Sequence, residues 1–130
     1  MGKLSAFLKP SPAGKTKEVF LDRFTDENGT IVPFVVKSIT AEENEAIARR
    51  CTNKNGVLDS ASYGNQLIVA CVAEPDLKDA ELCKFYGVMD PNMVPGRMLS
   101  VGEKSVLQDA IMEINDIKTA KRKLDEAKNS

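Results

Sequence analysis

A run of seven apolar residues, Leu67 to Ala73, is the strongest feature in the pattern of hydrophobic and polar positions. Polar residues precede the run without a clear turn signal, and Asp59 before them can cap a helix N-terminus. The run therefore predicts a helix over residues 60–74 that is apolar all round and buried. A buried strand is the alternative, because Val69 and Val72 favour strands while the alanines and the cysteine of the run do not.

A second, amphipathic stretch follows Pro75, a residue that a helix interior excludes because it lacks an amide proton and its ring needs space. Leu82, Phe85 and Tyr86 recur at i, i+3 and i+4, which is the spacing of one helical face. We therefore expect a helix over residues 79–86 that folds back and covers the apolar helix, so that the two form a helical hairpin.

Residues 16–39 have the pattern of a β-hairpin. Apolar residues are frequent in 18–24 and 30–39, and Asn28-Gly29 between them supplies the positive φ angles of a tight turn. Pro33 cannot donate to a β-ladder, so we expect an unpaired edge near the start of the second strand. Because two strands alone are marginal, they need the helices or a third strand. One face of the second strand should meet the helices, and it carries Val32, Phe34 and Val36.

Two capping boxes mark the starts of two further helices. Thr40-Ala41-Glu42-Glu43 opens a helix over 40–51, and Ser100-Val101-Gly102-Glu103 opens one over 101–115. The first helix has only a thin apolar stripe and should lie on the surface, whereas the second has a wide stripe that should pack on the central hairpin.

Together these elements predict an α+β fold, in which an N-terminal β-hairpin packs on a mainly helical domain of about four helices. The single domain should span residues 16–117. Residues 1–15 contain two prolines among lysines and serines, so we expect a flexible N-terminal arm. Residues 118–130 are polar apart from Leu124 and a few small residues, so we expect a solvated tail.

Composition removes several classes of function. The chain has 130 residues with 18 basic and 19 acidic side chains, so it lacks the electrostatic footprint of a nucleic-acid-binding protein. No apolar stretch approaches the ~20 residues of a membrane span. Histidine is absent and the three cysteines are widely spaced, so the residues predict neither a catalytic triad nor a metal site. We therefore expect a non-enzymatic protein without a cofactor, which binds neither nucleic acid nor membrane.

Three methionines occur in the irregular stretch of residues 88–99. Methionine fills irregular gaps in a core, and it also lines adaptable binding surfaces, so its presence leaves both roles open. Combined with the expected strand edge, the stretch suggests a partner-binding surface. Its candidate residues are Pro33, Met89 and Met93.

A series of short segments, each unspecific alone, occurs in a specific order and spacing along nearly the whole chain up to Ile117. The segments are Phe7-Leu8-Lys9-Pro10, Ser38-Ile39-Thr40-Ala41-Glu42-Glu43-Asn44-Glu45, Glu74-Pro75-Asp76-Leu77, Asp79-Ala80-Glu81-Leu82, Tyr86-Gly87-Val88, Gly102-Glu103 and Glu113-Ile114-Asn115. In this order they resemble the XkdN-like family of phage tail assembly chaperones, found in phages and prophages of Gram-positive bacteria. Lys104 and Asp116 depart from it, because the family commonly has an aromatic residue and a glycine there.

The resemblance implies an assembly factor of the bacterial host cytoplasm that binds the tape measure protein before the tail tube polymerises around it. It implies that the factor leaves before the virion matures, that it has no catalytic residue, and that the tail tube subunit is a second candidate partner. A structural tail component retained in the virion, or a generic protein-interaction adaptor, is the alternative. The sequence leaves open whether the chain forms homo-oligomers.

Overall fold

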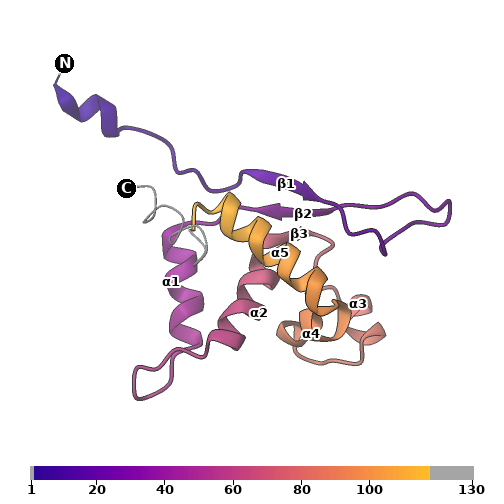
Figure 1. Ribbon diagram of the computed structural model, residues 1–130. Helices are drawn as coiled ribbons and strands as arrows, with labels where there is room; N and C mark the ends of the chain where they lie inside the picture. Colours follow the sequence, from indigo (N-terminus) through magenta and orange to yellow (C-terminus); the bar gives the residue numbers. More distant parts are fainter. Residues whose placement is uncertain (1, 118–130) are drawn as a thin grey trace, which may run out of the picture.

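The computed structural model describes residues 2–117, and within them a three-stranded antiparallel sheet is joined to five α-helices (Figure 1). The predicted α+β class is confirmed. The predicted polar tail, residues 118–130, lies outside the described residues. In chain order the elements are η1 (Lys3–Phe7), β1 (Thr16–Val19), β2 (Phe34–Lys37), α1 (Ala41–Arg50), α2 (Ser60–Cys71), β3 (Val72–Glu74), α3 (Ala80–Phe85), η2 (Pro91–Met93), α4 (Val94–Met98) and α5 (Val101–Ile114).

The central strand of the sheet is β2, which pairs with β1 on one side and with β3 on the other. The register with β1 runs from Thr16 opposite Lys37 to Val19 opposite Phe34. The unpaired edge was expected near the start of the second strand, at Pro33, which lies before β2 begins. Within β2 the second edge is paired with the third strand, with Val35 opposite Glu74 and Val36 opposite Val72, and this third strand comes from the end of the apolar run.

The apolar run divides between a helix and a strand. Helix α2 ends at Cys71, and Val72–Glu74 form β3, so the predicted helix over 60–74 is three residues too long. The reason is that β-branched Val72, three positions before Pro75, pairs with Val36 of β2. The predicted burial of the run is confirmed at Leu67, Ile68, Cys71 and Val72.

The β-hairpin is present but its paired strands are short. Residues 20–33 connect β1 to β2, and the predicted turn forms within this connection, where Gly29 has a φ of +78°. The amide of Asp26 donates to the carbonyl of Thr30 at 2.9 Å. Val32 is exposed, so the prediction that it faces the helices is wrong. It lies before the paired strand begins, where strand alternation no longer fixes the direction of its side chain.

The second arm of the expected helical hairpin does not cover the first. Helix α3 buries Cys83, whereas Phe85 is 80% exposed. The main neighbours of α2 are instead α1, α5, η2 and α4. Helix α4 was not predicted, because Pro95-Gly96 suggests a turn; Pro95 falls in the first helical turn, where a proline is tolerated.

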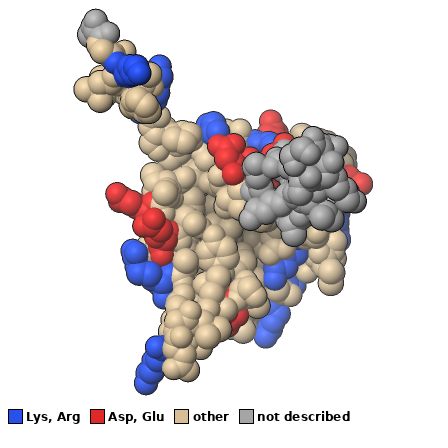
Figure 2. All heavy atoms as spheres, turned by 60° about the vertical axis from the view of Figure 1, so that its left-hand side comes forward, with Lys and Arg blue, Asp and Glu red and all other residues tan. Residues whose placement is uncertain are grey.

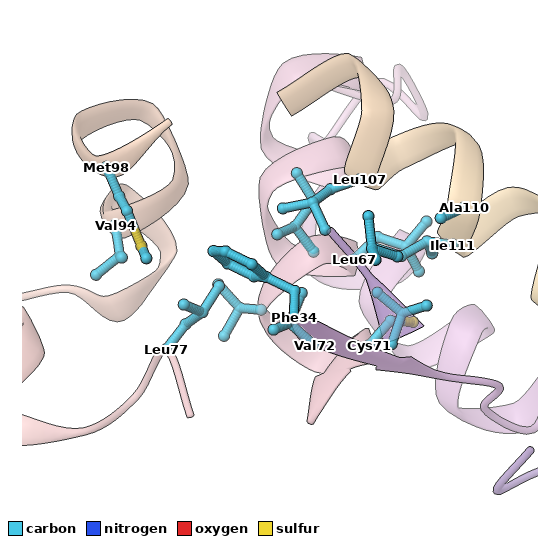
Figure 3. Packing of buried hydrophobic residues seen from close by; sticks show 14 of the residues in the cluster. Phe34, Leu67, Cys71, Val72, Leu77, Val94, Met98, Leu107, Ala110 and Ile111 are labelled. Carbon is cyan, nitrogen blue, oxygen red and sulfur yellow. The ribbon is translucent and has the colours of Figure 1, made fainter. Parts of the chain in front are cut away.

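The hydrophobic core lies where α5 packs against β1 and β2 and against α2 (Figures 1 and 3). Both predicted capping boxes form, Thr40 with Glu43 at α1 and Ser100 with Glu103 at α5. Away from the core, η1 extends from the body and has no buried residue. The side chains labelled in Figure 3 mark the core: Phe34, Leu67, Cys71, Val72, Leu77, Val94, Met98, Leu107, Ala110 and Ile111.

Candidate partner-binding groove

Two hollows on the surface have one lining residue in common, Pro75, and we refer to the two together as the Pro75 groove. The first, of about 300 Å³, lies between the β-hairpin connection and β3, and the second, of about 410 Å³, lies against α3. The first is lined by Phe24, Thr25, Val32, Pro33, Phe34, Glu74, Pro75 and Met98. The second is lined by Pro75, Asp76, Asp79, Glu81, Leu82 and Phe85.

Aromatic and charged contacts fix the wall of the first hollow. Phe24 meets Phe34 edge-on, with ring centroids 4.9 Å apart, and the guanidinium of Arg23 lies 4.5 Å from the centre of the Phe24 ring. Arg23 Nη2 also donates to the carbonyl of Met98 at 2.7 Å and, with Nε, to both carboxylate oxygens of Glu103. The hairpin connection is therefore tied to the junction of α4 and α5, which brings Phe24 and Met98 into one wall.

The second hollow is shaped by the short segment between β3 and α3. Leu77 is buried and anchors this segment in the core, and its carbonyl lies 3.6 Å from Cys83 Sγ. Asp79 caps α3, because one of its carboxylate oxygens accepts from the amides of Glu81 and Leu82. These contacts hold Leu82 and Phe85 beside Pro75.

The three candidate residues from the sequence do not share this groove. Pro33 lines its first hollow, but Met89 and Met93 are absent from the lining of both. Met89 is fully exposed, at 100%, and Met93 is about half exposed. Met98 is buried and contributes to the wall of the first hollow, so it has the gap-filling role that methionine often takes.

Sequence reasoning did not find Phe24, Pro75 or Phe85 as groove residues. In the sequence Pro75 indicates only a break between two helices, and the spacing of Phe85 predicts a helical face that packs on the apolar helix. The signal for Phe85 was weak, because a six-residue helix such as α3 shows too little periodicity to decide which side is covered.

The described residues offer little for catalysis. All three cysteines are free and buried, and burial raises the pKa of the Cys71 thiol to about 11, so this thiol is protonated at neutral pH. Among residues 2–117 there is no group of three histidine, cysteine, aspartate or glutamate side chains that could hold a metal ion. None of the helices in that range has the length and apolar character needed to cross a membrane.

A further hollow lies between α2 and α5, where Gly64 has no side chain and the end of the Gln108 side chain comes close to it. Its volume is about 270 Å³, and its lining includes Leu67, Ile111 and Ile117. On the face in Figure 2, basic and acidic side chains are interspersed, and neither sign forms a continuous patch.

Comparisons with known proteins agree with the fold. The model of the phage XkdN-like tail assembly chaperone family matches residues 4–128. The chain is 31% identical to the uncharacterized protein YqbN of Bacillus subtilis over 94% of this chain and 90% of that protein. It is 30% identical to the phage-like element PBSX protein XkdN of the same species, over 97% of this chain and 93% of that protein.

A solved structure shares the architecture. The crystal structure of the protein YqbN superimposes with a TM-score of 0.77 at 31% sequence identity, covering 91% of this chain and 99% of that one. The residues that the family model matches, 4–128, cover nearly the whole sequence. The chain therefore belongs to the XkdN-like family of phage tail assembly chaperones.

Proposed function

We propose that this protein binds the tape measure protein during tail assembly, without catalysis, and keeps it competent for assembly until the tail tube forms around it. Family membership supports the general role. The observation that carries the binding role is the exposure of Met89 and Met93 on a folded chain. The other large apolar side chains that the folded chain leaves in water are Leu4, Phe7, Leu8, Phe20, Val32, Val57, Leu58, Phe85, Val101 and Val106.

Exposed apolar side chains suit a protein that holds a client for a limited time. Single exposed hydrophobic residues are ordinary. Here, however, Met89 is fully exposed and Met93, which follows it closely in the sequence, is half exposed. Their two flexible thioethers can adapt to varied apolar faces. Such side chains bind by burying apolar area, which needs no fixed geometry in the client. Met89 and Met93 are therefore proposed as client-binding residues, with Pro33 in the separate groove.

The proposed place of action is the cytoplasm of the bacterial host, before the virion is complete. A pull-down of the tape measure protein from the same phage or prophage, co-expressed with the full-length chain, tests the binding. We expect a specific complex; recovery of the tail tube subunit alone would instead favour the second candidate partner.

Purified virions provide the second test. Mass spectrometry should detect the tape measure protein and should not detect this chain. Stoichiometric recovery of this chain from mature particles would mean that it is a retained structural component, and the proposed transient role would then be wrong.

A further inference from the structure

We infer that the Pro75 groove binds a segment of the client in which an apolar row is flanked by lysine or arginine, as in a basic amphipathic helix. This inference rests on the proposed function, because it assigns a surface and a chemistry to the same client. It goes beyond that function in naming a groove that contains neither Met89 nor Met93.

The floor and margins of the groove are suited to apolar anchors. The first hollow is formed mainly by Phe24, Val32, Pro33 and Met98, and the second receives Leu82 and Phe85. Val32 and Phe85 are exposed at the margins, so a bound segment would remove both from water. Two neighbouring hollows that share Pro75 can each receive one apolar side chain of a helical segment, at spacings such as i and i+3 or i+4.

The charged side chains that line the groove have one sign, and the guanidinium of Arg23 behind Phe24 is paired with Glu103. The lining side chains that carry charge are all acidic, namely Glu74, Asp76, Asp79 and Glu81. Lys78 and Lys84 belong to the same stretch of chain but line neither hollow. An apolar floor with an acidic margin is complementary to a segment whose apolar row is bordered by basic residues.

None of the four carboxylates has a basic side chain as an ion-pair partner in the described part of the chain. The ion pairs found within residues 2–117 join Lys15 to Asp116, Lys17 to Glu113 and Arg23 to Glu103. Asp79 and Asp76 each accept backbone amides through one oxygen, Oδ1, and they keep their negative charge for a partner. No group of histidine, cysteine, aspartate or glutamate side chains that could hold a metal ion is found in the same range, so the four carboxylates do not converge on one point. Dispersed acidic groups along an apolar groove suit a basic peptide better than a cation, and they repel nucleic acid.

The contacts around the groove indicate that it is formed before a partner arrives. The Arg23–Glu103 pair and the Phe24–Phe34 contact hold one wall, and the Asp79 cap with buried Leu77 holds the other. A preformed groove loses little conformational entropy on binding.

Overlapping 20-residue peptides of the tape measure protein, immobilised and probed with the full-length chain, test the chemistry of the partner. We expect the retained peptides to be amphipathic with a net positive charge, and their retention to fall as salt rises. Retention of mainly acidic or uncharged peptides would overturn the inference.

Two pairs of variants test the location. Glu81→Lys reverses a charge at the groove, and Glu42→Lys is its control, because both residues are exposed in the second position of a helix. We expect Glu81→Lys to weaken the best peptide about 10-fold or more at low salt, and Glu42→Lys to leave it unchanged. Phe85→Ser should weaken the peptide similarly, with Phe20→Ser as the exposed aromatic control outside the groove.

The outcomes separate this inference from the proposed function. If the tape measure protein binds but Glu81→Lys and Phe85→Ser bind it as the unmodified chain does, the groove assignment alone fails. If no complex forms with the tape measure protein at all, the proposed function fails and the groove assignment falls with it. If light scattering shows an oligomer that these two variants dissociate, the occupant is a second copy of the chain, and the inference is wrong.

Discussion

Arg23 and Glu103, 80 positions apart in the sequence, form a two-point ion pair that joins the β-hairpin connection to the start of α5. Arg23 Nε and Nη2 donate to the two carboxylate oxygens of Glu103 at 3.0 and 2.6 Å. Glu103 also accepts from the amide of Ser100 as part of the α5 capping box. One carboxylate therefore both starts a helix and orients the wall of the Pro75 groove.

The first prediction is a specific acid sensitivity. The hydrogen bonds from Arg23 and from the Ser100 amide lower the pKa of Glu103 to about 2. Because this pKa is below the value of about 4.3 in an unfolded chain, the stabilisation is present above pH ~4.3 and is lost as the pH falls towards 2. The thermal midpoint of the unmodified protein should fall over this interval, in part through Glu103.

Glu103→Gln isolates that contribution, since glutamine can still complete a capping box but carries no titrating charge. The variant should be less stable than the unmodified protein at neutral pH, and the difference between their midpoints should shrink between pH 4.3 and 2. The measurement is a series of melting curves for both proteins. Parallel midpoints across that range would show that Glu103 does not titrate as inferred.

The second prediction concerns the core. Ile68 is fully buried, and Ile68→Ala should lower the free energy of unfolding by ~2–5 kcal/mol, because it removes apolar contacts and leaves a cavity. Val101→Ala is the control: this residue is 91% exposed at the start of α5, so its truncation should change the free energy by less than about 0.5 kcal/mol. Chemical denaturation measures both, and equal effects would contradict the assigned burial.

The sequence alone predicted the features whose causes are local. The apolar run predicted the burial of Ile68, the two capping boxes predicted the starts of α1 and α5, and Asn28-Gly29 predicted a turn that forms. Each of these depends on residues within a few positions of one another, so the pattern carries the information.

Features that depend on distant partners were not predictable in the same way. Strand β3 has three residues and exists through its pairing with β2, in which Val36 pairs with Val72 and Val35 with Glu74, so nothing local distinguishes it from the end of a helix. The spacing of Leu82 and Phe85 shows that they share a helical face, but it does not show whether another element covers that face. The Pro75 groove likewise requires Phe24, which distant Glu103 holds in place through Arg23.

The third prediction compares two glycines. Gly64 lies within α2, and an added Cβ would lie 3.0 Å from the end of the flexible Gln108 side chain. Gly64→Ala should therefore stabilise the protein by about 0.5–1 kcal/mol once Gln108 moves aside, because alanine is the better helix residue. Gly87 has a φ of +67°, so Gly87→Ala should destabilise by about 1–2 kcal/mol. We expect Gly64→Ala to raise the denaturation midpoint and Gly87→Ala to lower it. If both substitutions lower the midpoint, the Gln108 side chain cannot move aside.

The last prediction separates binding from folding among the three methionines. Met89 is fully exposed and Met93 half exposed, whereas Met98 is buried at 6% exposure and packs in the core (Figure 3). Replacing both Met89 and Met93 with serine removes apolar surface that the folded chain leaves in water, so the melting temperature should change little. Under the proposed function, isothermal titration with a tape measure fragment should show weakened binding.

Met98→Ser should do the reverse. It should lower the melting temperature, because it places a hydroxyl and a cavity in the core. The molecules that remain folded should keep the part of their affinity for the tape measure fragment that does not come from the Pro75 groove, which Met98 lines. Normal titration by the double variant would remove Met89 and Met93 from the client-binding surface, and a large drop in its melting temperature would show that their thioethers support the fold instead.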